Sequence, residues 1–161
     1  MSNSDDPTPF RRRAPIPAAI CPMAQAAEIL GDRWTLLILR EAFYGVLRYA
    51  DILADTGAPR AMLTDRLNKL VAAGILERRP YQEKGARLRH AYGLTAKGMA
   101  LAHVMMAMAE WGEDHVTGKE APVALVDHRS GHGLRLAFVD PEGTIVARDH
   151  ARLRRRDASQ D

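Results

Sequence analysis

Positively charged side chains gather in one stretch of this sequence, residues 60–89. The stretch holds eight lysines or arginines against three acids, a local balance of +5, whereas the whole chain carries +3. A basic patch on a helix and a hairpin is the electrostatic footprint of a DNA-binding protein, and the alternative is a solvated charged surface. We expect Arg60 and Thr64 to contact base edges. Phosphate contacts are expected from Arg66, Lys69, Lys84, Arg87 and Arg89.

A lone cysteine is the second group with reactive chemistry. Cys21 directly precedes Pro22, and because proline is favoured in the first turn of a helix, the cysteine is expected at the helix N-cap. The positive end of the helix dipole favours an anionic thiolate there, which lowers the expected pKa of the thiol and predicts a reactive cysteine. The alternative is a small buried hydrophobic side chain. A single cysteine excludes a disulfide or a cysteine-based zinc cluster within one chain.

Other groups give little indication of catalysis. A nucleophilic cysteine would need a base in reach, but all six histidines are distant from Cys21 in the sequence, and no phosphate-binding glycine loop or nucleophile elbow occurs. His128 and His132, beside Asp127, are spaced as metal ligands could be, yet a strand-turn context favours surface residues. We therefore expect no enzyme, no bound metal and no cofactor.

A helix followed by a hairpin must carry the basic stretch. Leu63, Leu67 and Leu70 recur at i, i+4 and i+7, which predicts a helix with one apolar face. Gly74 ends this helix, and the segment 75–94 has the apolar ends and glycine-containing reversal of a hairpin.

Three further helices are predicted upstream, over 22–30, 33–43 and 48–56. A tight turn over 56–59 joins the third to the basic helix, and two short helices in this arrangement form a helix-turn-helix. With the hairpin as its wing, the predicted fold is mainly α with a small β wing, a winged helix-turn-helix, followed by a short C-terminal β appendage.

A helix over 95–115 should follow the wing. Its apolar residues are spaced 3, 4 and 3 apart, the pattern of a helix that packs on a partner helix, and its methionines adapt to irregular surfaces. A core-facing helix in a monomer gives the same pattern, but dimerisation is favoured because the helix lies outside the winged unit. The expected dimer seam or effector pocket consists of Trp34, Leu101, Val104, Met108 and Trp111.

The chain divides into four predicted segments. A flexible arm (1–20) precedes the winged unit with its dimerisation helices (21–116). A β-rich extension of three strands (117–150) and a basic frayed tail (151–161) follow. The arginines at 11–13 imitate an export signal, but prolines interrupt the next run, and no segment reaches the length of a membrane span. We expect a cytoplasmic protein without a membrane partner.

Five motifs then occur in one order. They are Cys21-Pro22, GDRWTLLILRE from Gly31, MLTDRLNKLVAAGILER from Met62, YGLTAKG from Tyr92 and Trp111-Gly112. Together, over about residues 21–115, they resemble the HxlR-type winged helix-turn-helix transcriptional regulators, distant relatives of the MarR type.

The resemblance implies a homodimer on a pseudo-palindromic DNA operator, acting as a repressor or an activator. It places the basic helix in the major groove and the wing at the flanking minor groove or backbone. It also implies that Cys21 can sense oxidants, quinones or aldehydes, here only through Cys21 of the partner or a small-molecule adduct. Other members bind small aromatic effectors. The second interpretation is an architectural or protein-interaction winged-helix module without an effector.

Overall fold

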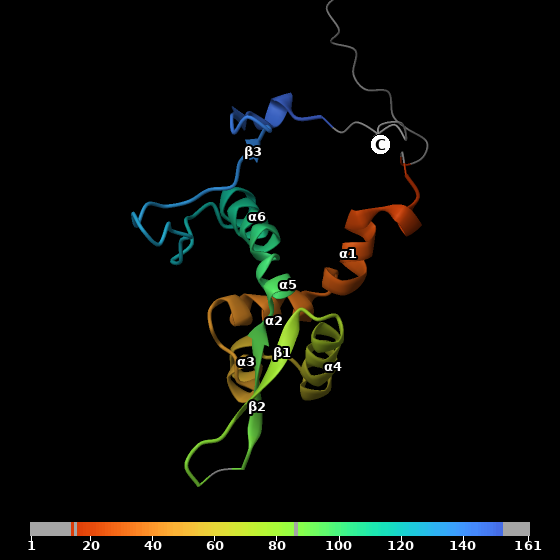
Figure 1. Ribbon diagram of the computed structural model, residues 1–161, viewed down its shortest axis with the longest axis vertical. Helices are drawn as coiled ribbons and strands as arrows, with labels where there is room; N and C mark the ends of the chain where they lie inside the picture. Colours follow the sequence, from red (N-terminus) through yellow and green to blue (C-terminus); the bar gives the residue numbers. More distant parts are fainter. Residues whose placement is uncertain (1–13, 15, 86, 153–161) are drawn as a thin grey trace, which may run out of the picture.

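The winged body of the protein consists of three helices and a hairpin. The computed structural model describes residues 14, 16–85 and 87–152. Within it, α2 (Arg33–Phe43), α3 (Tyr49–Thr56) and α4 (Arg60–Ala72) pack beside an antiparallel hairpin, β1 (Leu76–Tyr81) and β2 (Arg89–Leu94) (Figure 1). The predicted winged helix-turn-helix is confirmed.

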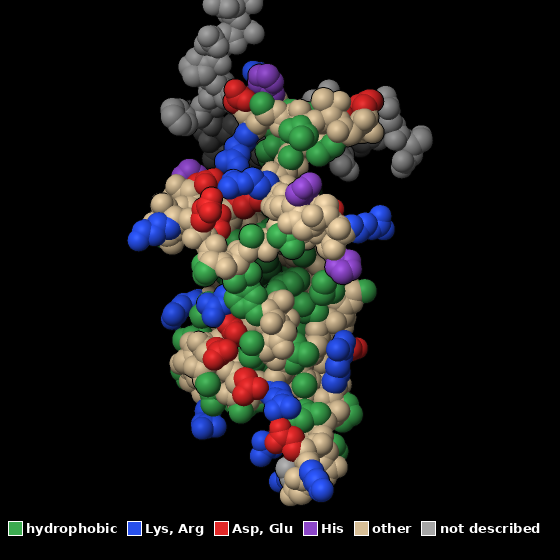
Figure 2. Space-filling model, turned by 90° about the vertical axis from the view of Figure 1, so that its left-hand side faces the viewer, with side chains coloured by type: hydrophobic (Ala, Val, Ile, Leu, Met, Phe, Trp, Pro, Cys, Tyr) green, Lys and Arg blue, Asp and Glu red, His purple; other side chains and the backbone are tan. Residues whose placement is uncertain are grey.

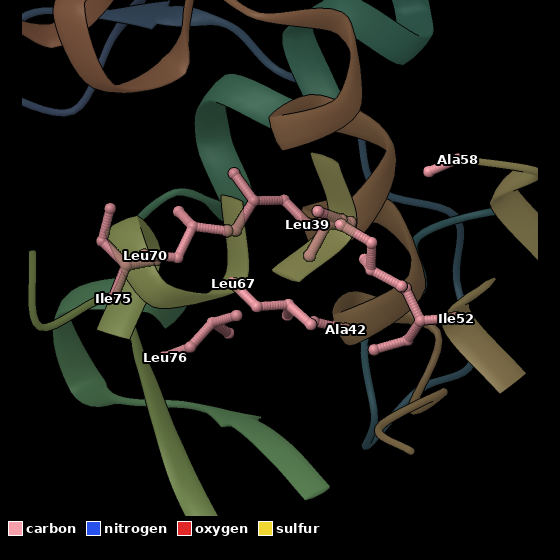
Figure 3. Close-up of a cluster of buried hydrophobic side chains, with 10 residues drawn as sticks. Leu39, Ala42, Ile52, Ala58, Leu67, Leu70, Ile75 and Leu76 are labelled. Carbon is pink, nitrogen blue, oxygen red and sulfur yellow. The ribbon is translucent and has the colours of Figure 1, made fainter. Parts of the chain in front are cut away.

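The core of this body comes from residues that the helical periodicity picked out. Leu63, Leu67 and Leu70 of α4 are buried against Ile38 and Leu39 of α2. Figure 3 shows Leu39, Leu67 and Leu70 of this cluster between the helices and the start of β1. The remaining members of the cluster are Ala42, Ile52, Ala58, Ile75 and Leu76.

Helix ends follow the local sequence signals. Asp32 caps α2, since its carboxylate accepts a hydrogen bond of 3.0 Å from the Thr35 amide. Glycines in the left-handed region end the next two helices: Gly57 has φ +64° after α3 and Gly74 has φ +68° after α4. Helix α3 begins one residue later than predicted because Arg48 is its N-cap.

The wing is a hairpin fixed to the connection between α2 and α3. Its register runs from Leu76 opposite Leu94 to Tyr81 opposite Arg89, with Pro80 of β1 opposite His90. The other side of β2 pairs with the α2–α3 connection, because the Tyr92 amide donates to the Leu47 carbonyl at 2.8 Å. The wing therefore starts from a supported base.

The helix predicted over 95–115 is broken, which corrects that expectation. A short α5 (Ala96–Met99) is followed by a turn and then by α6 (Ala102–Gly112), and a π-helical turn, η2 (Glu113–Thr117), ends it. The Thr95 hydroxyl donates to the Gly74 carbonyl at 2.6 Å, and Gly98 lies against the Ile75 carbonyl so closely that a Cβ would be 2.3 Å away. These contacts hold α5 on the α4–β1 turn, and α6 leaves after the break.

Helix α1 (Pro22–Leu30) and α6 extend from the body on the side opposite the wing tip (Figure 1). Neither helix contains a buried residue. A 3-10 turn, η1 (Ala18–Ile20), precedes α1. Residues 1–13 and 15 of the predicted arm, and 153–161 of the predicted tail, lie outside the described residues. Among the described helices, none combines the length and apolarity needed to cross a bilayer.

The C-terminal extension has less β structure than predicted. Only β3 (Phe138–Val139) and β4 (Ile145–Val146) pair as strands, with one isolated bridge between Val126 and Gly133 and a 3-10 turn, η3 (Arg148–His150), after them. The expected three-strand arrangement is wrong, because the segments around Leu125 and Leu134 meet only at that isolated bridge. The turn expected over 140–143 is present, and Asp140 accepts hydrogen bonds from the amides of Glu142 and Thr144.

Candidate nucleic-acid interface

The first turn of α4 presents Arg60 and Thr64 to solvent. Both residues are exposed, and a helical spacing of four places them on one face. Tyr49 of α3 supports this turn: its hydroxyl lies 3.2 Å from the Arg60 carbonyl and 3.1 Å from the Thr64 hydroxyl. The Thr64 hydroxyl also donates to the Arg60 carbonyl at 2.9 Å. Thr64 thus has its proton engaged within the protein, while the Arg60 guanidinium remains available.

Arg66 lies elsewhere, in an intramolecular ion pair. Its Nε donates to Asp32 Oδ1 at 2.9 Å and its Nη2 to Oδ2 at 3.2 Å, and it also pairs with Asp65. The Arg66 side chain is only 18% exposed. Its hydrogen bond is the main reason that the pKa of Asp32 is lowered from 3.8 to about 2. This geometry favours a structural role for Arg66 over the expected phosphate contact.

Lys69 remains on the surface of α4. Its ammonium pairs with Asp65 at 3.0 Å, one helical turn away, and this hydrogen bond is the first cause of a lowered pKa of Asp65. Exposed pairs of this kind contribute little to stability. Lys69 can therefore exchange its carboxylate for a phosphate at low cost.

The wing carries the other three expected contacts. Lys84, Arg87 and Arg89 are all exposed, and Figure 2 shows lysine and arginine side chains, with carboxylates among them, at the wing end of the molecule. Gly85, with φ +78°, allows the reversal beside Lys84. The wing cations thus extend the positive surface of α4 along the hairpin.

Two arginines that the sequence analysis did not assign hold the wing in place. Arg48 pairs with Glu83 at 2.7 Å, and its guanidinium lies 4.9 Å from the centre of the Tyr81 ring. Arg78 donates from Nη2 to the Asn68 side chain of α4 at 2.6 Å. Arg48 lies outside the basic stretch, so its only sequence signal was a cation at the start of a helix.

The apolar face of α6 is a separate surface. Val104, Met108 and Trp111 line a shallow hollow together with His103 and Ala107, and Trp111 is 57% exposed. Two residues expected here lie elsewhere, because Leu101 and Trp34 pack at the margin of the body core. The Arg33 guanidinium covers the Trp34 ring at 4.6 Å.

Cys21 lies at the N-cap of α1 and is half-buried, without a side-chain hydrogen bond to the helix amides. The histidines at 128 and 132 are exposed, and Asp127 serves the turn between them by accepting hydrogen bonds from Arg129 and Ser130. Among the described residues, no group of three or more potential ligands could hold a metal ion.

Comparison with known proteins explains this arrangement of helix, wing and cations. The family model of the HxlR-like helix-turn-helix matches residues 29–120. The chain belongs to this family. An HTH-type transcriptional regulator of Mycobacterium tuberculosis, itself uncharacterised, is 38% identical over 108 residues, which are 67% of each chain. As an HxlR-family member, the protein is a DNA-binding transcriptional regulator.

Solved structures place the HxlR-family protein among transcription factors. PA1607, a proposed transcription factor, superimposes with a TM-score of 0.71 at 33% identity and covers 86% of this chain and 96% of its own. The redox regulator HypR in its oxidised form gives a TM-score of 0.52 at 26% identity, over 59% of this chain and 97% of its own. Both the family and these neighbours are regulators rather than enzymes.

Proposed function

We propose that this HxlR-family regulator is a repressor that binds a pseudo-palindromic operator as a homodimer and is released by an oxidant, an electrophile or a small aromatic effector. The observation that carries the proposal is the position of two exposed surfaces. Arg60 and Lys69 of α4 are exposed together with the cations of the wing, whereas apolar side chains are exposed on α6, which extends from the other side of the body (Figure 1). A dimeric helix-turn-helix protein needs one surface for DNA and a separate one for its partner.

In this proposal α4 enters the major groove. Arg60 contacts base edges, for which guanine is the preferred partner of an arginine. Lys69 contacts phosphates beside it, while Lys84, Arg87 and Arg89 contact phosphates at the flanking minor groove. The exposure of these side chains supports the assignment. Repression follows where the operator overlaps a promoter, because the bound dimer then blocks RNA polymerase from that promoter. The proposed location of the protein is the cytoplasm.

The dimer forms through α6 with help from α1. Val104, Met108 and Trp111 are exposed in one chain, and pairing two such faces removes apolar surface from water. Two recognition helices must then stand about 34 to 36 Å apart to occupy successive major grooves. A change at the seam alters that separation and releases DNA.

Two groups are candidates for the release signal. Cys21 begins α1, next to the proposed seam, and one structural neighbour, HypR, is a redox regulator by name. The hollow beside Trp111 has the apolar lining that an aromatic effector would need. Either signal would act on the dimer rather than on the DNA-binding residues.

The test measures binding of the purified protein to its own promoter DNA and to scrambled DNA, with and without a quinone or peroxide. We expect preference for the promoter, loss of binding with the oxidant, and restoration by dithiothreitol. The Cys21→Ser variant should bind the promoter with the affinity of the wild type, and the oxidant should not reduce that affinity. Binding that no reagent affects would remove the thiol switch, and equal affinity for both DNAs would favour an architectural module instead.

A further inference from the structure

Helices α1 and α2 meet at a tight elbow formed by Gly31 and Asp32. The Gly31 amide donates to the Ala27 carbonyl at 2.7 Å, which closes α1. A Cβ on Gly31 would lie 2.5 Å from that carbonyl oxygen, so any other residue would force the elbow open. Asp32 follows directly as the N-cap of α2. The position of Asp32 is therefore tied to both helices.

The carboxylate of Asp32 also reaches the middle of the recognition helix. Two nitrogens of Arg66 contact its two oxygens, at 2.9 and 3.2 Å, while Oδ1 keeps its bond to the Thr35 amide. A two-point contact fixes the plane of the guanidinium as well as its position. The side chains are 18% and 33% exposed, so water competes less than at a fully exposed pair.

Helical geometry separates Arg66 from the side of α4 that faces outward. Arg66 is three residues after Leu63 and four before Leu70, both of which are buried. Residues so spaced are neighbours on the helix, so Arg66 flanks the buried leucines on one side, whereas the turn of about 100° per residue places Arg60 and Thr64 on the opposite flank. Its charge is directed to α2 rather than to a ligand.

We propose that Asp32 and Arg66 are a positioning pair that sets the orientation of α4 against the α1–α2 elbow, and thereby the sequence preference of DNA binding. The inference rests on the proposed function and identifies the Asp32–Arg66 pair as the contact that controls the sequence preference. Helix α1 has no buried residue, and its last residue, Leu30, packs against the body core beside the elbow, so a displacement of α1 reaches the body there. The pair passes such a displacement directly to the recognition helix.

The experiment compares Asp32→Ser, Arg66→Gln and the double variant, each titrated with promoter and with scrambled DNA over a range of salt. Serine retains the N-cap of α2 while it removes the ion pair. Each single variant should lose about tenfold in the ratio of promoter to scrambled affinity, the scale of one charge-assisted hydrogen bond. The double variant should lose no more than either single one. The salt dependence should not change.

Lys69→Gln is the matched control, since Lys69 is an exposed cation on the same helix. It should lower the salt slope by about one while keeping the preference. The proposal is overturned if Arg66→Gln behaves like Lys69→Gln, or if Asp32→Ser binds every DNA more tightly, because both results would make Arg66 a phosphate contact.

Two further measurements distinguish failure of the positioning role from failure of the proposed function and from unfolding of the variants. Wild-type protein without any promoter preference would contradict the proposed function itself. Arg66→Lys keeps the charge but not the two-point contact, and it serves if the other variants unfold. It should retain a cooperative thermal transition and lose preference at an unchanged salt slope. A folded Arg66→Lys protein with full preference would refute the positioning role.

Discussion

In the proposed function, the Tyr49 hydroxyl is the contact that prepares Arg60 for DNA. It holds the carbonyl of Arg60 and the hydroxyl of Thr64 at the start of α4, so the backbone that carries the guanidinium is fixed before DNA arrives. Fixing this backbone beforehand lowers the entropy lost on binding. Arg60 should therefore account for more of the sequence preference than Thr64.

Arg60→Ala is expected to cost about 1 to 3 kcal/mol at the operator and to relax sequence preference, because a base contact is lost. Fluorescence anisotropy with operator variants measures both effects. The control is Arg129→Ala, which removes an exposed arginine from a turn of the extension. A uniform loss over all DNA sequences would instead identify Arg60 as a phosphate contact.

The lowered pKa of Asp32 makes the free energy of unfolding depend on pH in the acid range. Its pKa is lowered to about 2, so its stabilising effect is complete above its ordinary value of 3.8 and disappears as the pH falls through about 2. The unfolding free energy of the wild type should fall more between about pH 4 and pH 2 than that of Arg66→Gln, in which the largest cause of the lowered Asp32 pKa is removed. Denaturant titrations measure this difference, and parallel curves would contradict it.

At the scale of elements, the wing is a hairpin held to the body by several contacts. The hairpin is joined to the body by the Tyr92–Leu47 hydrogen bond, by the Arg48–Glu83 pair and by the contact from Arg78 to Asn68. Its tip carries Lys84 beyond these contacts. The wing should thus supply affinity at a fixed distance from α4 without reading sequence.

Lys84→Ala is expected to weaken binding to promoter and scrambled DNA equally and to lower the salt slope by about one, because one phosphate contact is lost. Binding isotherms at several salt concentrations give this slope. Glu142→Ala, in an exposed turn of the extension, is the control for a charge change remote from DNA. A selective loss at the promoter would show that the wing reads sequence.

The sequence predicted best those elements that short-range signals determine. The bounds of α1 and α2 follow from Pro22, from Gly31 and from the capping Asp32, all adjacent to the ends they define. The break before α6 was missed because the apolar spacing continues across it, whereas the contact of Gly98 with the Ile75 carbonyl, which holds α5 on the body, exists only after folding. Alternation of apolar residues in the extension predicted longer strands than the two-residue β3 and β4, because alternation does not show whether a strand finds a partner to pair with.

The candidate site shows the same division. Exposure of Arg60 and of the wing cations follows from the helical face and the hairpin, so these residues could be identified from spacing. The ion pair of Arg66 could not be predicted, because its partner, Asp32, is 34 residues away in the sequence. Arg48 was missed because its role depends on Tyr81 and Glu83 of the folded wing.

At the scale of the whole molecule, the proposed function assigns DNA to the winged body and a partner chain to the exposed α6. The extension is attached to this helix region through carboxylates: Glu110 accepts the Leu136 amide at 2.9 Å and Glu113 accepts the Ala121 amide at 2.8 Å. No described residue from 117 onward is buried. The apolar residues of α6 are thus the natural place to test assembly.

Met108→Glu is expected to convert the dimer to a monomer and to reduce promoter affinity, because a carboxylate would be desolvated at the seam. Sedimentation velocity measures the assembly, and anisotropy the affinity. Leu88→Glu places the same charge on an exposed apolar residue of the wing and should leave the sedimentation coefficient unchanged. A Met108→Glu protein that remains dimeric would place the seam elsewhere.

Pro80 in the wing bears on behaviour at high concentration. The Tyr92 amide points to Leu47 and away from β1, so Tyr92 and Arg78 face each other as a pair without hydrogen bonds. Hydrogen-bonded and non-hydrogen-bonded pairs alternate along an antiparallel hairpin, so the pair of Pro80 with His90, two positions further along, is also without hydrogen bonds. The Pro80 nitrogen therefore faces the outer edge of β1. Among the described residues, no strand pairs with that edge. An exposed edge invites strand addition from a neighbouring molecule, and a proline removes one of the donors that such addition needs. The wing can therefore stay long and exposed for DNA while resisting aggregation between copies of the regulator.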